Sequence, residues 1–294
     1  MLNAILLMLL TGVTWTAVGI LFGRAPTERD KLRSFFALNG IIFVSFVYLA
    51  RPPTAAPAAE VLRLACLMVP SALLEVVAFL LLKLAMERGS QGIAWCIAQS
   101  AMVISFLGAI LFLKNPSSPP QWLGMALMLG SLALFGRNRQ AAGGAVNDAT
   151  FFRLVFGAFA LVGVAQFLRL IPGYAGFSPE TLTWRLPLQA PVGMAFWLSV
   201  CAAKGAWRPG AVWTHSLPYG IVVALGQVFF YLATDAADKL RLTSIIMPVS
   251  IGTCILFFTL WCRLFRGERL SPGGWLAVAL NVAGIALLSL QPPA

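Results

Sequence analysis

Long apolar stretches, each bounded by a few polar residues, recur along the whole 294-residue chain. A helix needs roughly 20 apolar residues to cross the hydrocarbon core of a bilayer. The stretches lack the period-2 alternation of transmembrane strands, so we expect an all-α polytopic membrane protein. Ten helices are predicted, at about Leu2–Phe22, Phe35–Ala50, Leu62–Met86, Gly92–Leu113, Trp122–Gly136, Phe152–Ile171, Trp184–Ala203, Leu217–Thr234, Thr243–Leu264 and Gly274–Leu290.

The composition agrees with a bilayer environment. The chain is 60% hydrophobic and only 11% charged, whereas a soluble domain is about one quarter charged. The net charge of +11 comes from Lys and Arg residues in the short gaps between apolar stretches. They form no continuous basic face, so we expect lipid headgroups as their partners and no nucleic acid.

The segment around Trp122 is repeated around Trp275, 153 residues later, without a gap. Both copies read Ser-Pro-x-x-Trp-Leu-x-x-Ala-Leu, which indicates a duplicated and fused unit. The longest polar interval lies between them, and we interpret 138–150 as a linker between repeats at 1–137 and 151–294. Each repeat holds five predicted helices. Because five is odd, the second repeat should be inverted relative to the first.

One turn of the second repeat carries a resemblance to a known superfamily. Residues 265–272 read Phe-Arg-Gly-Glu-Arg-Leu-Ser-Pro and precede Trp275 and a small-residue helix. This resembles the C-terminal signature of the EamA-like branch of the drug/metabolite transporter superfamily. The first repeat departs from the signature, because Lys114-Asn115-Pro116 stands where Gly-Glu-Arg is expected.

The resemblance implies secondary transport of a small polar metabolite or drug, often export, across the cell (inner) membrane. It implies no cofactor and no ATP, and the sequence contains no G-x-x-x-x-G-K-[ST] loop. It also implies cytoplasmic termini. The loop charges point the other way, since the loops after odd-numbered helices hold more Lys and Arg and would be cytoplasmic, with the termini outside.

Glu75 is the sharpest candidate for a working residue, because it lies in the middle of an apolar stretch. An ionised carboxylate at this depth costs roughly 2.5–3.5 kcal/mol, so it needs a cavity, a partner or a proton. We therefore consider Glu75 a candidate proton carrier or counter-ion for a substrate. The alternative is a paired or protonated Glu that only holds helices together.

Other polar and aromatic residues at membrane depth could line a central substrate site or simply pack between helices. They are Trp15, Trp95, Gln99, Gln166, Gln227, Tyr231 and Thr253. Pro70 and Pro248 interrupt two of the predicted helices and are candidate hinges for alternating access, although static kinks are an equal alternative. Among the basic residues, we expect Lys83 to snorkel to the interface and Arg169 to contact lipid headgroups. Contact with an anionic substrate at a cavity mouth is the alternative for Arg169.

Small residues four apart in the fifth and tenth predicted helices, Ala126/Gly130 and Ala279/Ala283, should pack helix on helix, within the chain or in a homodimer. The leading functional hypothesis is a carrier of a small molecule, coupled to protons or working by exchange. An uncoupled facilitator and a flippase for a lipid-linked intermediate are alternatives. An intramembrane enzyme is the weakest, because we find no catalytic pair at depth, and a metal site is not expected with a single His.

Overall fold

The computed structural model describes residues 2–50, 52–114, 117–137, 148–238, 246–268, 270–288 and 290. Side chains at 136, 137, 234, 235, 237, 238, 247 and 248 lie outside this description. Within the described ranges, all the regular structure is helical. Most of the predicted linker falls at 138–147, outside the described residues, and the next helix begins at Ala149.

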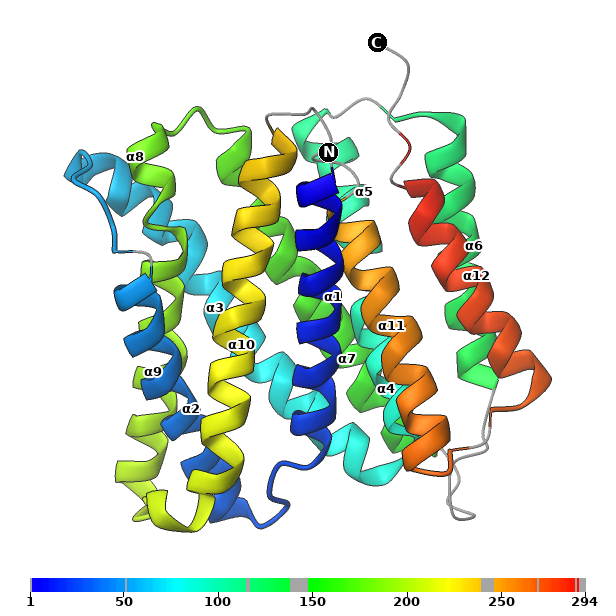
Figure 1. Cartoon of the computed structure of the whole chain (residues 1–294), viewed down its shortest axis with the longest axis horizontal. Helices are drawn as coiled ribbons and strands as arrows, with labels where there is room; N and C mark the ends of the chain where they lie inside the picture. The colour runs from blue at the N-terminus through cyan, green and yellow to red at the C-terminus, as the bar shows by residue number, and fades with distance from the viewer. Residues whose placement is uncertain are drawn as a thin grey trace.

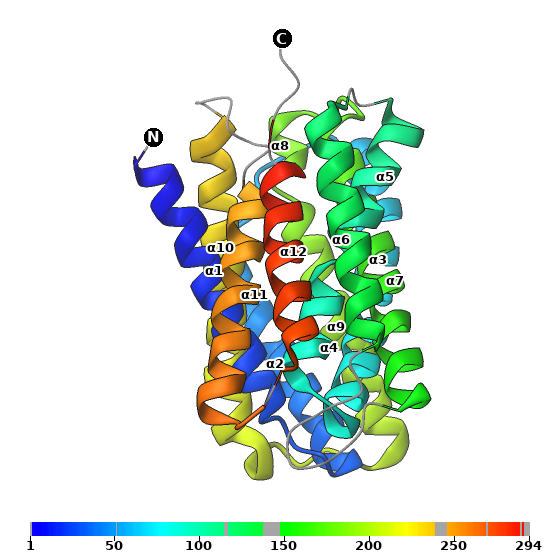
Figure 2. The same ribbon diagram turned by 90° about the vertical axis from the view of Figure 1, so that its right-hand side faces the viewer.

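The first half of the chain forms α1 (Leu2–Gly23), α2 (Arg29–Ala50), α3 (Ala58–Arg88), α4 (Gln91–Gln99), α5 (Met102–Leu113) and α6 (Pro119–Arg137). The second half forms α7 (Ala149–Leu170), the 3-10 turn η2 (Ile171–Gly173), α8 (Pro179–Leu182), α9 (Arg185–Lys204), α10 (Pro209–Asp238), α11 (Ile246–Phe265) and α12 (Pro272–Leu288). The long helices stand side by side and run from one end of the molecule to the other, as Figure 1 and Figure 2 show.

The described residues contain seven segments that are long and apolar enough to cross a membrane. They are Leu2–Gly23, Arg29–Ala50, Ala58–Arg88, Gln91–Leu113, Ala149–Gly173, Pro179–Lys204 and Pro209–Ala233. Large apolar side chains such as Leu6, Phe112 and Phe265 are exposed on the outside. Lipid tails offer no hydrogen-bond partners, and a helix pairs its own backbone N–H and C=O groups. Helices with this apolar surface therefore suit the hydrocarbon core of a bilayer. The chain is a multi-pass α-helical membrane protein.

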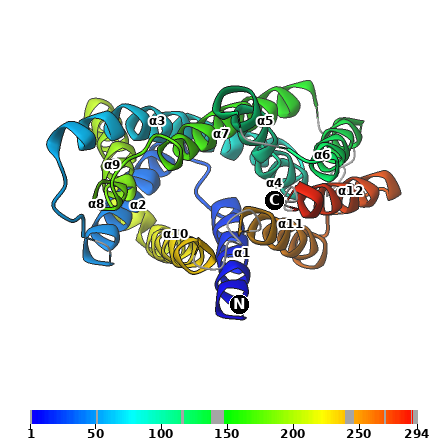
Figure 3. The same cartoon turned by 90° about the horizontal axis from the view of Figure 1, so that it is seen from above.

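Seen from above, α6 and α12 lie side by side at one edge of the bundle, and the other long helices surround a common centre (Figure 3). A Cβ added at Gly124 would lie 2.6 Å from the carbonyl oxygen of Gly284, and the reverse contact has the same distance. These two glycines therefore bring the α6 and α12 backbones together. The predicted small pairs lie elsewhere: Ala126/Gly130 and Ala279/Ala283 are exposed on the outer faces of α6 and α12.

The stretch predicted as one helix at Gly92–Leu113 is interrupted, because α4 ends at Gln99 and α5 begins at Met102. Ser100 lies at the interruption and is fully buried. Its hydroxyl donates to the carbonyl of Cys96 at 2.7 Å and accepts from Nδ2 of Asn281 at 2.6 Å. The same Nδ2 donates to Ser131 at 2.9 Å. Hydrogen bonds among residues of α4, α6 and α12 thus support the turn inside the apolar bundle.

Candidate functional site

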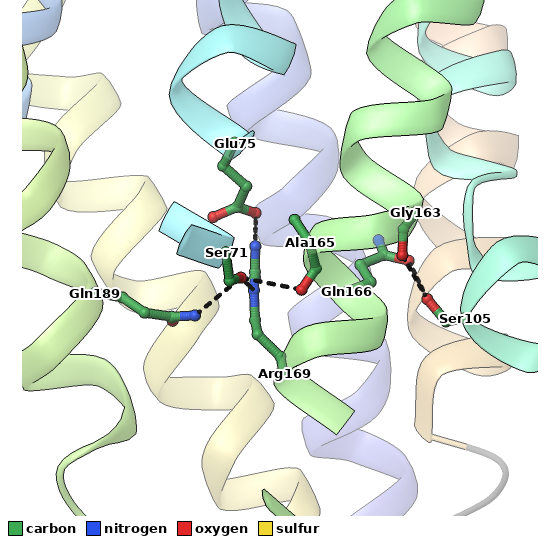
Figure 4. Close-up of polar contacts among 8 residues, drawn as sticks. All are labelled: Ser71, Glu75, Ser105, Gly163, Ala165, Gln166, Arg169 and Gln189. Carbon is green, nitrogen blue, oxygen red and sulfur yellow. Dashed lines mark hydrogen bonds and ion pairs between the residues drawn. The ribbon is translucent and has the colours of Figure 1, made fainter. Parts of the chain in front are cut away.

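Glu75 lies near the middle of α3 and forms an ion pair with Arg169 of α7 (Figure 4). The pair joins Oε1 of Glu75 to Nη2 of Arg169, and 30% and 26% of the two side chains are exposed. Leu73 and Val77 are more than 40% exposed and mark the lipid-facing side of α3. Because successive helical residues are about 100° apart, Glu75 lies about 160° from each of them. The carboxylate therefore points into the bundle.

Ser71 connects the pair to a third helix. Its hydroxyl accepts from Nε of Arg169 at 3.0 Å and from Nε2 of Gln189 on α9 at 3.4 Å. It donates to the carbonyl of Ala165 on α7 at 3.0 Å. Glu75, Arg169, Ser71 and Gln189 are together called the polar cluster below. One guanidinium is thereby held by an ion pair and a hydrogen bond, in an orientation that the protein fixes before any ligand arrives.

Arg169 thus contacts Glu75 rather than lying free at the lipid headgroups as we expected. Arg169 follows Ala165 by four positions on the same helix, and its side chain reaches inward toward α3. Pairing with Glu75 stabilises both charges at a depth where either alone would be costly. The sequence signal for this partnership is weak, since the two residues are 94 positions apart and Arg169 is close to the end of its apolar stretch.

Gln166 lies on α7 but turns away from the polar cluster. Its Oε1 accepts from Ser105 of α5 at 3.4 Å, and Ser105 also donates to the carbonyl of Gly163 at 3.3 Å (Figure 4). A Cβ at Gly163 would lie 2.5 Å from Ile104, so α5 and α7 are in close contact here. The contacts described for Gln166 therefore serve interhelical packing.

Trp15 of α1 packs against Gly226 of α10, which has no side chain to keep the ring away. A Cβ at Gly226 would lie 2.9 Å from the Trp15 ring, and the Phe230 ring is 5.6 Å from it. Tyr231 follows, with its ring 5.6 Å from that of Phe230. Gln227 is half-buried beside Gly226. This part of the α1–α10 contact is aromatic, whereas the α3–α7 contact carries the charges.

Three further predicted site residues lie near α11. Trp95 is 1% exposed, donates from Nε1 to the Cys254 sulfur at 3.1 Å and packs 5.3 Å from the Phe258 ring. Thr253 packs against Gly12, whose added Cβ would lie 2.6 Å from the Thr253 Cβ. Gln99 is half-buried at the last position of α4. The Trp95 indole is part of the packed core.

A cluster of rings from five helices closes the bundle on one side of the polar cluster. The aromatic cluster consists of Phe22, Phe35, Phe36, Phe79, Trp197 and Tyr219. The Phe22 ring is fully buried and lies 5.6 Å from Phe79 and 5.8 Å from Tyr219. Phe79 is one helical turn from Glu75. The rings lie toward the end of the bundle where α1 ends and α2 begins.

The Gly-Glu-Arg-Leu turn of the second half has a structural role. The Glu268 carboxylate is 5% exposed and accepts from the backbone nitrogens of Gln91 at 2.9 Å and Gly92 at 3.1 Å. It also accepts from the Ser90 hydroxyl at 2.5 Å. A carboxylate at a helix N-terminus is stabilised by the free N–H groups and by the helix dipole. Glu268 therefore fastens the α11–α12 turn to the start of α4.

The prediction that Lys83 snorkels to the interface is wrong. Its side chain is 1% exposed, and Nζ donates to the carbonyl of Ala25 at 2.8 Å. It also lies 3.4 Å from the Glu87 carboxylate. The ammonium is thus held inside the bundle, between the end of α3 and the α1–α2 loop, by partners that replace water.

The two predicted hinges are only partly described. The helix α3 is continuous through Pro70, whose side chain is exposed toward the outside. Pro248 lies in α11, but its side chain is outside the described part of the chain. Whether either proline acts as a hinge remains a prediction.

No protein-family model matches the chain, and no curated protein matches it. Among solved structures, the chain is similar to one described as "Crystal structure of protein", with a TM-score of 0.57 and 17% sequence identity. The superposition covers 97% of this chain and 95% of that one. The two chains therefore share a fold over nearly their whole lengths, and at this identity the likeness concerns the fold alone.

Proposed function

We propose that the protein is a secondary transporter of a small polar molecule in the cell (inner) membrane. The observation that carries this proposal is the Glu75–Arg169 pair, which points into the bundle at membrane depth and is oriented by Ser71 and Gln189. Ionisable residues inside a membrane protein mark substrate or ion pathways by default. The aromatic cluster on one side of the pair supports alternating access, because a carrier must close one face while the other is open.

We also propose ten spanning helices in two inverted five-helix repeats, of the EamA-like type. The helix contacts support this arrangement. Let α1, α2, α3, α4–α5 and α6 correspond to α7, α9, α10, α11 and α12. If each helix is replaced by its counterpart in the other repeat, the α3–α7 contact becomes α10–α1 and the α3–α9 contact becomes α10–α2. In the same way, the α1–α11 contact becomes a contact of α7 with α4–α5. All of these contacts are present.

Backbone geometry at the turn before the last helix of each repeat supports the same correspondence. Gly267 has φ of 67°, and Lys114, which is 153 positions earlier, has φ of 54°. This left-handed region is uncommon for residues other than glycine. Two equivalent turns therefore keep the same unusual conformation although only one of them has a glycine.

The coupling mechanism follows from the charge of the pair. Protonating Glu75 would leave Arg169 without its counter-ion at depth, which is costly. A proton on Glu75 and a substrate anion on Arg169 would therefore favour each other. Without such a ligand, the intact pair favours exchange of one bound substrate for another.

The test is reconstitution of the protein into liposomes, followed by uptake and counterflow of amino acids, sugars, nucleosides and cationic dyes. Glu75→Gln should lower transport of the accepted compound at least about tenfold. Glu28→Gln is the matched control, because Glu28 is an exposed loop carboxylate paired with Lys31 at 2.7 Å. Transport by Glu75→Gln at the wild-type rate, with unchanged pH dependence, would refute a role for the pair. An uncoupled facilitator would show uptake but no dependence on a proton gradient or on a substrate inside.

A specific observation keeps the flippase as a second candidate. An apolar groove of about 570 Å³ runs along the outer seam of α3 and α9, with Leu73 and Val192 among its lining residues. Leu73 adjoins the polar cluster in sequence, and Val192 is three positions from Gln189. An acyl chain in the groove could accompany a headgroup at the cluster. Movement of a fluorescent anionic or zwitterionic lipid between leaflets, without transport of any water-soluble compound, would favour this function.

A further inference from the structure

The charges of the polar cluster restrict the kind of substrate that can bind there, provided that the transporter function proposed above is correct. The cluster holds one carboxylate, one guanidinium and neutral side chains, so its formal charge is zero. Glu75 and Arg169 pair with each other in the absence of a ligand. Any ligand that uses these charges must separate or displace this pair and then satisfy both members, because an unpaired charge at membrane depth is costly.

A ligand with a single charge cannot satisfy both members by itself. A cation would pair with Glu75 and leave Arg169 with only its hydrogen bond to Ser71. An anion would pair with Arg169 and leave Glu75 without a counter-ion unless Glu75 also took up a proton. A ligand that carries both an ammonium and a carboxylate replaces one ion pair by two and keeps the net charge at zero. The fixed guanidinium suits the carboxylate, since Ser71 holds Nε and leaves Nη2 directed toward Glu75.

We infer that the substrate is a small zwitterion, with its ammonium on Glu75 and its carboxylate on Arg169. The Ser71 hydroxyl accepts from the guanidinium and from the neutral amide of Gln189, so neither partner adds charge. Transport of a zwitterion through this site moves no net charge on the protein or the ligand. It should therefore depend only weakly on membrane potential.

The test compares compounds that differ only in charge. Alanine, leucine and phenylalanine are each measured beside their amides, which are cations, and their N-acetyl derivatives, which are anions. β-Alanine and γ-aminobutyrate increase the distance between ammonium and carboxylate, and glycine betaine replaces the ammonium by a quaternary ammonium. Binding to the purified protein is read from the shift of its thermal transition, and transport is read from counterflow in liposomes.

At least one zwitterion should bind and exchange, and its singly charged relatives should be at least about tenfold weaker. Glu75→Gln should lose the zwitterion and retain the matched anion, while Arg169→Gln should lose it and retain the matched cation. Arg153→Gln is the control, since Arg153 is an exposed cation near the start of the same helix. Size-exclusion profiles establish that each variant is folded.

Preference of the wild-type protein for the amide or the N-acetyl form would overturn the zwitterion while leaving a transporter in place. Retention of zwitterion exchange in both single variants would overturn it as well. Failure of every compound in this charge series to bind or exchange overturns the zwitterion. The wider panel of sugars, nucleosides and dyes then decides separately whether the protein transports anything.

Discussion

Replacing Glu268 tests how the two halves of the chain are fastened together. In the structure this buried carboxylate accepts from two backbone N–H groups of α4 and from the Ser90 hydroxyl. A hydrogen bond to a charged group contributes about 1.5–3 kcal/mol. The helix N-terminus adds about 0.3–1 kcal/mol. These contributions are not additive.

We therefore expect Glu268→Ala to destabilise the protein by about 2–4 kcal/mol. Glu268→Gln keeps one acceptor oxygen and the side-chain volume, so about 1–2 kcal/mol is expected. The assay is the midpoint of thermal unfolding in detergent, followed by size exclusion. At about 2–4 °C per kcal/mol, Glu268→Ala should lower the midpoint by roughly 5 °C or more.

Glu28→Gln serves as the matched control, because Glu28 forms an exposed ion pair with Lys31 that should contribute at most about 1 kcal/mol. The expected order of the midpoints is therefore Glu28→Gln, then Glu268→Gln, then Glu268→Ala, from high to low. An unchanged midpoint for Glu268→Ala would refute the view that this carboxylate holds the start of α4.

Two further substitutions test packing and backbone geometry. Gly284→Leu should prevent folding or lower the thermal midpoint strongly, because even a Cβ there would lie 2.6 Å from the Gly124 carbonyl oxygen. Gly130→Leu is the control and should fold normally, because a Cβ there would have nothing within 4 Å. Equal size-exclusion profiles for the two variants would contradict the close contact of α6 and α12. Lys114→Gly should raise the free energy of unfolding by up to about 1 kcal/mol, and with it the thermal midpoint, since it removes a left-handed non-glycine residue. Gly267→Val should lower the midpoint, and a lower midpoint for Lys114→Gly would contradict the assigned conformation.

The sequence predicted the helices because a bilayer leaves the backbone few choices. Apolar stretches of spanning length must satisfy their own hydrogen bonds, and a helix does so. The starts of helices were less well predicted. The helix α2 begins at Arg29 and α10 at Pro209, ahead of the apolar stretches that marked them. The first turn of α2 is charged and that of α10 contains proline and glycine, so hydropathy did not mark either start.

The interruption between α4 and α5 could not be predicted from its own residues. Serine also occurs in unbroken helices, so Ser100 alone does not mark an interruption. Its stabilising partner Asn281 lies 181 positions later in the chain. The same reason explains why Arg169 was assigned to the headgroups. Its contact with Glu75 depends on how α3 and α7 pack, and neither sequence stretch shows that on its own.

Glu75 itself could be singled out, because an isolated carboxylate in an apolar stretch always requires an explanation. The aromatic candidates were harder to separate. Trp15 and Trp95 look alike in sequence, but Trp15 is half-buried over Gly226 while Trp95 is sealed in the core against Cys254. Lys83 looked like a snorkelling residue because it is near a helix end. Its buried partner Ala25 lies in the α1–α2 loop, which the sequence around Lys83 does not reveal.

A double-substitution cycle on Glu75 and Arg169, with stability and transport measured on the same preparations, tests the central claim most directly. Each single change to Gln leaves one charge unpaired and should cost about 1–3 kcal/mol as well as transport. The double variant removes both charges, so it should regain most of the lost stability and still fail to transport. Wild-type transport by the double variant would contradict the claim, because the pair would then only hold α3 against α7.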